Sequence, residues 1–220
     1  MKYKIILLML LLLSVSIFIN SSTAFALTGD EALAKLSERL ASAGTMKGKI
    51  NISYQSGEIY SGIFMYMQPG KLYVKFTDPP GKLIVTNGKK LWIYDSTTDV
   101  CGVQELETYG EVSEDNEKQI KPRLRGGIQQ FLQGYESTFT SGSSSQNIIE
   151  LLNPNKIYSD IKFILNSDFM LISAVFKNAE GNGFSIKLSD LKTGEKITPG
   201  IFNFKAPANA QVIKNPLDVR

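Results

Sequence analysis

Hydrophobic and polar residues alternate in four short runs along residues 62–95, GIFMYMQPGKLYVKFTDPPGKLIVTNGKKLWIYD. From Leu72 to Phe76 every other residue is apolar, which places these side chains on one face of a strand and their neighbours on the other. Pro-Gly, Pro-Pro-Gly and Asn-Gly separate the runs, and such pairs are typical of tight turns. The pattern predicts an antiparallel meander with one apolar face, and we expect Leu83 and Val85 to continue that face.

Two segments have the period of a helix instead. Leucines recur at three- and four-residue spacing within residues 28–43, where Thr28 and Glu31 have the spacing of a capping box and Gly44 is typical of a helix end. A second stripe predicts a short amphipathic helix and consists of Ile128, Phe131, Leu132 and Tyr135.

Strand-like alternation recurs outside the meander, at residues 47–55, 58–68 and 100–106 and through much of 147–213, including 202–213. The predicted fold class is therefore mainly β (α+β). We expect about nine to eleven antiparallel strands and two or three short helices.

The first 26 residues have the pattern of a cleavable secretory signal peptide. Lys2 and Lys4 precede an apolar run, and Ala24 and Ala26 supply the small residues that a signal peptidase needs. The alternative, an uncleaved membrane anchor, is disfavoured because the run is shorter than the roughly 20 residues that span a bilayer. We expect cleavage after Ala26, export to the periplasm, and a single domain over residues 27–220.

Composition narrows the classes of function. Both basic residues of the expected signal peptide are removed with it, which leaves 22 Lys and Arg against 21 Asp and Glu and no charge argument for nucleic acid binding. The chain has no histidine and a single cysteine, Cys101, so Ser-His-Asp and Cys-His catalysis and the usual zinc sites are excluded. We expect neither an enzyme nor a metal or cofactor site, and Cys101 to be a small apolar core residue.

Oppositely charged blocks adjoin at residues 105–125. Six acidic residues up to residue 117 are followed by four basic ones. Two interpretations stay open, a solvated loop leading into the helix and a docking patch for an acidic partner.

Several motifs together resemble the LolA-type carriers of outer-membrane lipoproteins. They are Pro69, Leu72-Tyr73-Val74, Pro79, Ile84-Val85-Thr86-Asn87-Gly88-Lys89, Leu91-Trp92-Ile93-Tyr94, Leu152-Asn153-Pro154, Glu180-Gly181-Asn182 and Phe202-Asn203-Phe204-Lys205-Ala206-Pro207. The resemblance implies an unclosed β-barrel with helices as a lid over an apolar cavity for acyl chains. It also implies a monomeric periplasmic chaperone that takes acylated lipoproteins from an inner-membrane lipoprotein-releasing transporter to an outer-membrane receptor.

The resemblance assigns roles to particular residues. Ile128, Phe131 and Leu132 would form a lid helix, and Gln68 would latch it, where the family has a basic residue. Because of that departure, a second function stays open, a LolA-fold envelope protein that binds another lipid or a protein partner in a regulatory role. The expected acyl-chain cavity consists of Phe64, Tyr66, Leu72, Val74, Phe76, Leu83, Val85 and Ile93.

Overall fold

The computed structural model describes residues 27–106, 132–142 and 146–215. The expected signal peptide and two residues of the expected lid helix, Ile128 and Phe131, lie outside these ranges, as does nearly all of the charged segment. Among the helices of the described residues, none has the length and hydropathy required to cross a bilayer.

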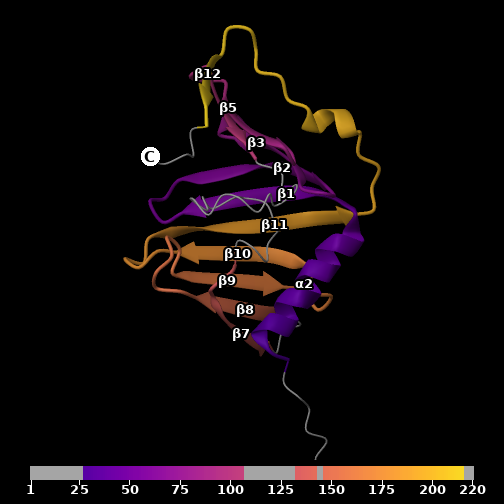
Figure 1. The fold of residues 1–220 in the computed structure, drawn as a ribbon, viewed down its shortest axis with the longest axis vertical. Coiled ribbons are helices and arrows are strands. Elements are labelled where there is room, and N and C mark those ends of the chain that lie inside the picture. The colour runs from indigo at the N-terminus through magenta and orange to yellow at the C-terminus, as the bar shows by residue number, and fades with distance from the viewer. Residues whose placement is uncertain (1–26, 107–131, 143–145, 216–220) are drawn as a thin grey trace, which may run out of the picture.

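One twisted sheet of twelve strands dominates the molecule (Figure 1). Its strand order is β12-β6-β5-β4-β3-β2-β1-β11-β10-β9-β8-β7, so β12 and β7 are its two edges and the sheet does not close. The strands are β1 (Thr45–Tyr54), β2 (Ile59–Met67), β3 (Lys71–Asp78), β4 (Pro80–Asn87), β5 (Lys90–Asp95), β6 (Val100–Glu105), β7 (Glu136–Ser141), β8 (Asn147–Leu152), β9 (Asp160–Leu165), β10 (Leu171–Lys177), β11 (Gly183–Thr193) and β12 (Gln211–Lys214). The predicted open, mainly β fold is confirmed, and the described residues alone contain one strand more than the nine to eleven expected.

A single α-helix within the described residues, α2 (Gly29–Ala43), lies across one face of this sheet. The predicted capping box is present. The Thr28 side chain accepts a hydrogen bond from the backbone N–H of Glu31, and the Glu31 carboxylate accepts one from the backbone N–H of Thr28. The helix ends at Gly44, whose φ of 63° is a conformation that favours glycine.

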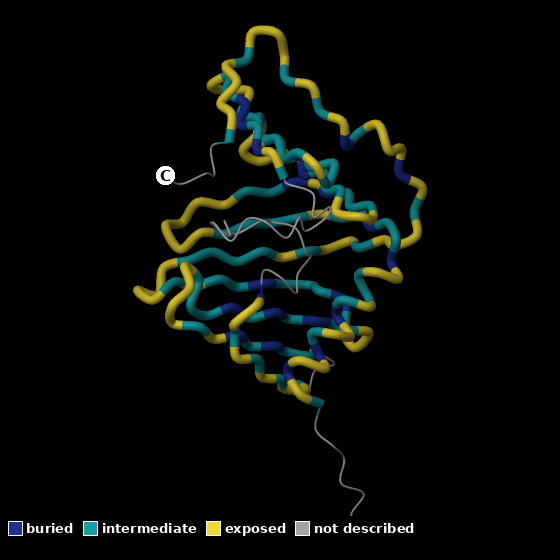
Figure 2. Tube along the Cα trace, viewed as in Figure 1, coloured by how far each residue is buried: buried dark blue, intermediate teal, exposed yellow. Residues whose placement is uncertain are grey.

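We call the face of the sheet toward α2 the inner face. Two clusters of buried apolar residues lie on it, and the Leu40 side chain packs against both. Figure 2 shows the buried positions alternating mainly with intermediate ones along strands such as β8 and β9. One cluster consists of Ala32, Leu36, Leu132, Ile149, Leu151, Ile161, Phe163, Leu165 and Ala174, and the other of Ala43, Met46, Phe64, Val74, Phe76 and Met170.

The opposite, outer face of β3 to β6 is covered by the chain that follows β11. This C-terminal segment includes the 3-10 helix η1 (Pro199–Phe202), which contacts β3 and β4, and the ring of Phe204 lies 5.6 Å from that of Tyr94. The segment then adds β12 to the edge of the sheet parallel to β6. The prediction of antiparallel strands over residues 202–213 was wrong there, because this segment crosses the outer face and pairs with the sheet only from Gln211 onward.

The pairing of β3 with β4 contains a bulge. Thr77 faces Pro80, but Lys75 faces Leu83, so the single residue Phe76 lies opposite both Gly81 and Lys82. An extra residue on one strand shifts the register by one, and a shift of one moves each later side chain to the other face.

Candidate functional site

The inner face of β2 and β3 is the candidate site, and five of the eight expected cavity residues lie on it. Phe64 pairs with Val74 and Tyr66 with Leu72, and directly paired residues share a face. Phe64 and Val74 are 4% exposed, and Phe76 is similarly buried in the cluster that also contains Met46 and Met170. The shared apolar face predicted for Phe64, Tyr66, Leu72, Val74 and Phe76 is therefore present, while their role in holding acyl chains stays a prediction.

Leu83 and Val85 were assigned to the wrong face. The bulge places them opposite Lys75 and Tyr73, which point away from α2. Val85 is fully buried, but on the outer face of β4, a strand that η1 contacts. Neither residue belongs to the inner face.

The same shift brings in a residue that the sequence pattern did not identify. Ile84 pairs with Val74 on one side and with Ile93 on the other, and it packs against the inner-face cluster of Phe64 and Val74. Ile93 shares that face as predicted, yet it is 41% exposed and lies outside both buried clusters. In the sequence, the feature that indicates this change of register is Gly81, which directly follows two prolines.

A row of aromatic rings crosses the inner face from β3 to β9, and the sequence pattern did not identify it either. Neighbouring rings lie between 4.8 and 6.4 Å apart, within the range of favourable ring pairs. The closest pair is Phe176 and Phe184, which stack at 4.8 Å. In order across the strands the row is Phe76, Tyr60, Tyr54, Phe184, Phe176 and Phe163.

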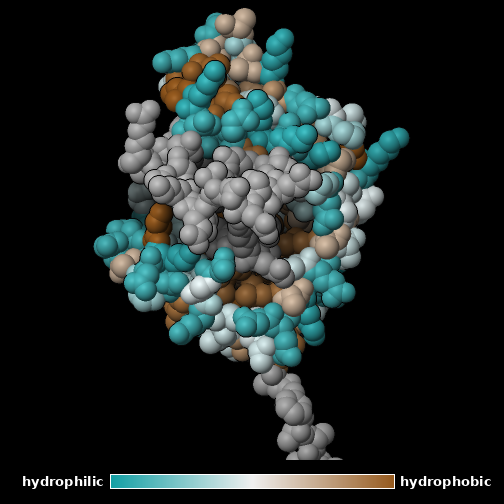
Figure 3. Space-filling view, viewed as in Figure 1, coloured by the Kyte–Doolittle hydropathy of each residue, from teal (hydrophilic) through white to brown (hydrophobic). Residues whose placement is uncertain are grey.

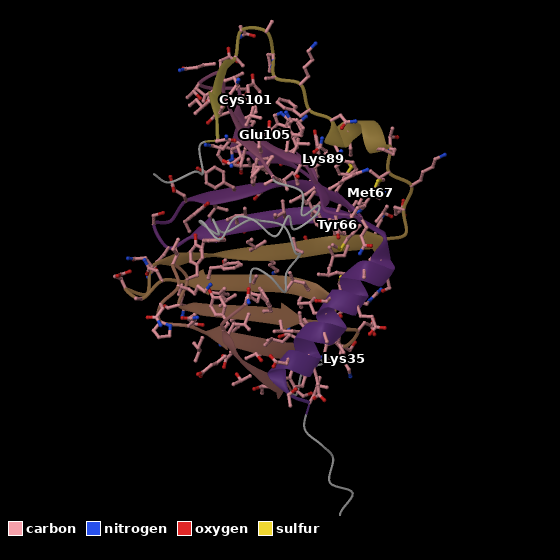
Figure 4. The ribbon with its side chains drawn as sticks, in the orientation of Figure 1. Lys35, Tyr66, Met67, Lys89, Cys101 and Glu105 are labelled. Atoms are coloured by element: carbon pink, nitrogen blue, oxygen red, sulfur yellow. The ribbon has the colours of Figure 1, made fainter. Side chains whose placement is uncertain are left out.

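Gln68 connects the end of β2 to the C-terminal end of α2. Its side-chain Nε2 donates a hydrogen bond to the backbone carbonyl of Leu40, 3.3 Å away, and its backbone N–H donates to the carbonyl of Gly44 at 2.9 Å. Burial raises the pKa of Tyr66, and a hydrogen bond with Gln68 offsets part of that rise. Figure 4 labels Tyr66 and Met67 beside this end of the helix. Gln68 therefore contacts α2 as a latch would, although α2 is not the helix expected to be latched.

Of the three expected lid residues, only Leu132 lies within the described residues. It is buried and belongs to the same cluster as Ala32 and Leu36 of α2. Leu132 itself lies in a turn before β7 rather than in a helix, and it packs in the cluster that α2 covers.

The inner face ends in an open hollow of about 860 Å³ between three connections, those from β1 to β2, β8 to β9 and β10 to β11. Tyr54, Tyr158 and Phe184 form its apolar wall, and polar side chains of the turns form its rim. In Figure 3, separate hydrophobic patches are visible among hydrophilic residues on the α2 side of the molecule.

Cys101 is buried on the outer face, and burial raises the pKa of its thiol. A thiol with a raised pKa holds little thiolate at neutral pH, so Cys101 is a poor nucleophile. Residues 27–106, 132–142 and 146–215 contain no group of three His, Cys, Asp or Glu side chains placed to bind a metal ion.

The fold and site define a class, an unclosed β-sheet whose apolar inner face is covered by a helix. Residues 44–205 match the family model described as "Outer membrane lipoprotein carrier protein LolA". The chain belongs to the LolA family, which confirms the resemblance.

Curated relatives agree with that assignment, and a solved structure shares the fold. The chain is 26% identical over 163 residues to the outer-membrane lipoprotein carrier protein of Legionella pneumophila (strain Corby), covering 70% of this chain and 73% of that one. It is 23% identical over 207 residues to the protein of that name from Coxiella burnetii (strain CbuK_Q154), covering 90% and 94%. An uncharacterized conserved protein from Thermus thermophilus has the same fold, with a TM-score of 0.53 at 17% identity over 84% of this chain and 98% of that one.

Proposed function

We propose that this protein is a periplasmic lipoprotein chaperone that holds acyl chains against the inner face of its sheet. Family membership supports a carrier, and the observation that carries the proposal is the apolar inner face itself. That face runs across the sheet from Ile84 to Ile149, and α2 is the one α-helix of the described residues that packs on it. Acylated lipoproteins would be the cargo, carried from an inner-membrane lipoprotein-releasing transporter to an outer-membrane receptor.

Binding and releasing acyl chains requires only apolar contacts and a cover that can open. Burying each CH₂ of an acyl chain contributes about 0.8 kcal/mol, so shape and exclusion of water suffice and no cofactor is required. Transfer from donor to receptor also requires that the helix covering the inner face can move away at a small cost in free energy. A neutral hydrogen bond such as that between Gln68 and Leu40 contributes only about 0.5–1.5 kcal/mol. The hydrogen bond therefore adds little to the cost of moving the end of α2 away from the strand, and most of that cost comes from the burial of Leu36 and Leu40.

The proposal includes the processing of the chain. Residues 1–26 would direct export and be removed, and residues 27–220 would act as one monomeric domain. Edman sequencing of the exported protein tests the cleavage site directly, with Leu27 expected as the first residue.

Purification from cells tests the function. We expect the exported protein, analysed by native mass spectrometry without detergent, to carry acylated protein or lipid, and the purified protein to bind a synthetic acylated peptide. A protein that carries no acyl group and binds no acylated peptide contradicts the carrier function. Stable binding of a protein partner that lacks acyl chains would instead support the regulatory role that the sequence left open.

A further inference from the structure

The two ends of β1 differ in how the inner face is closed. β1 begins directly after α2 and ends at Tyr54 ten residues later, a length of roughly 30 Å. At its first end Met46 is buried beside Phe64 and Val74, and Gln68 is bonded to α2. At its far end Tyr54 is 41% exposed and Ile157 is 84% exposed. The far end is therefore one place, like Ile93 on β5, where apolar surface of this face meets solvent.

The row of aromatic rings makes this far end continuous with the inner face. Phe176 contacts Phe163 in the buried cluster and stacks on Phe184, which lines the hollow between the three connections. Tyr158 packs edge-on against both Phe176 and Phe184, with ring centroids 5.6 Å away in each case. An acyl chain on the inner face can thus reach the hollow without crossing a polar barrier.

The rim of the hollow is polar and electrically balanced. Gln55 and Asn182 present amide side chains that make no hydrogen bond with any described residue, and Lys156 and Glu180 contribute one charge of each sign. Free amides can donate to and accept from a peptide backbone. A rim with no net charge does not select an anionic lipid headgroup. At about 860 Å³ the hollow falls within the roughly 300–1,000 Å³ of sites that hold small ligands.

We infer that this hollow is the exit of the acyl-chain site, where the polar N-terminal peptide of a lipidated protein leaves the inner face and binds the amides of Gln55 and Asn182. The inference rests on the proposed function, since it concerns the polar part of the same cargo. It places the peptide at the turn end of the sheet, about 30 Å from the latch at Gln68.

Matched ligands and variants test it. A palmitoylated peptide and free palmitate share the acyl chain and differ in the peptide. In the double variant Gln55→Ala/Asn182→Ala we expect the Kd for the palmitoylated peptide to rise on the order of tenfold, as for the loss of one or two neutral hydrogen bonds, and the Kd for palmitate to stay unchanged. Gln211→Ala, which truncates an exposed amide on β12, is the matched control and should change neither.

The position of the peptide gives a second readout. A spin label on the peptide beside its acylated residue should broaden the backbone amide signals of Ser56 and Gly181 and leave those of Gly44 and Gly70 sharp. Broadening at Gly44 and Gly70, an equal loss of affinity for both ligands in the double variant, or no loss for either overturns the inference. A wild-type protein that binds neither ligand contradicts the proposed function itself, an outcome distinct from the others.

Discussion

The side-chain amide of Gln68 donates a hydrogen bond to the backbone carbonyl of Leu40, with 3.3 Å between the nitrogen and the oxygen. Leu40 lies in the last turn of α2, and Gln68 directly follows β2, which carries Phe64 and Tyr66 on the inner face. A side chain next to the candidate site therefore holds the helix that covers it. Carbonyls at a helix C-terminus lack partners within the helix, so this bond also satisfies one of them.

Replacing Gln68 with arginine should hold α2 more firmly. A guanidinium is always charged, its hydrogen bonds are stronger than those of a neutral amide, and a cation near a helix C-terminus adds about 0.3–1 kcal/mol. We expect hydrogen exchange in the last turn of α2 to slow roughly two- to fivefold. Release of a bound acylated peptide should slow as well.

Gln211→Arg serves as the control for that variant, because it adds the same charge on β12. If exchange in α2 stays at the wild-type rate in Gln68→Arg, or slows equally in the control, the contact with Leu40 does not restrain the helix.

Ile84 and Leu83 form a matched pair, since they are consecutive, both partly buried, and on opposite faces of β4. Ile84→Asn should weaken binding of an acylated peptide roughly tenfold or more, because burial of an isoleucine side chain contributes about 1.5–3 kcal/mol. Leu83→Asn should leave binding within about twofold. Titration of both variants measures the difference, and urea denaturation checks that both are folded. Equal losses of affinity would show that the inner face does not hold the ligand.

The bulge between β3 and β4 depends on Gly81. Its φ of 102° disfavours any residue with a Cβ, and an added Cβ would lie 2.9 Å from the Ser96 hydroxyl. We expect Gly81→Ala to lower the free energy of unfolding by about 1–2 kcal/mol or more, measured by urea denaturation. Gly200→Ala is the control, because that site is open space and has no positive φ, and its stability should change by less than about 0.5 kcal/mol. Equal stability of the two variants would contradict a requirement for glycine at the bulge.

Stability at acid pH should depend on Asp95. Hydrogen bonds from the hydroxyl and the backbone N–H of Thr97, followed by one from Lys82, lower the pKa of Asp95 to about 2. A lowered pKa in the folded state stabilises the protein above the unfolded pKa near 4, and this contribution is lost as the pH falls toward 2. Between pH 5 and pH 2 the Asp95→Asn variant should therefore lose less stability than the wild type, measured as the urea midpoint at each pH.

Asp168→Asn is the comparison for that experiment. Its carboxylate makes no hydrogen bond with any described residue, so the wild-type acid dependence should persist in this variant. If the stability of Asp95→Asn falls with pH as much as that of the wild type, the hydrogen bonds of Asp95 with Thr97 and Lys82 do not determine the loss of stability at acid pH.

Features that depend on residues close together in the sequence could be predicted from it. The capping box of Thr28 and Glu31 and the end of α2 at Gly44 follow from interactions within a few residues, and both are present. The alternation of Leu72, Val74 and Phe76 likewise predicted which side chains share a face. The resemblance to the LolA family extended the prediction to an open sheet, because the turns and strand ends of that family have characteristic residues.

Contacts between segments far apart in the sequence could not be predicted from it. The row of rings draws Phe76, Tyr54, Phe184 and Phe163 from strands that are neighbours only after the sheet has assembled. The C-terminal segment has the composition of a strand, but it lies over the outer face because the apolar side chains of Val85 and Tyr94 require a cover there.

The sequence by itself determined most of the strands, the capped helix, the family, and six of the eight expected inner-face residues. Only the tertiary structure decided the rest, and the bulge at Gly81 shows why. Thr77 pairs with Pro80 next to the turn. If that register continued along the two strands, Leu83 would lie opposite Val74. One extra residue puts Ile84 there instead. Alternation specifies which residues of one strand share a face, but the face itself depends on register, which pairing with the neighbouring strand sets.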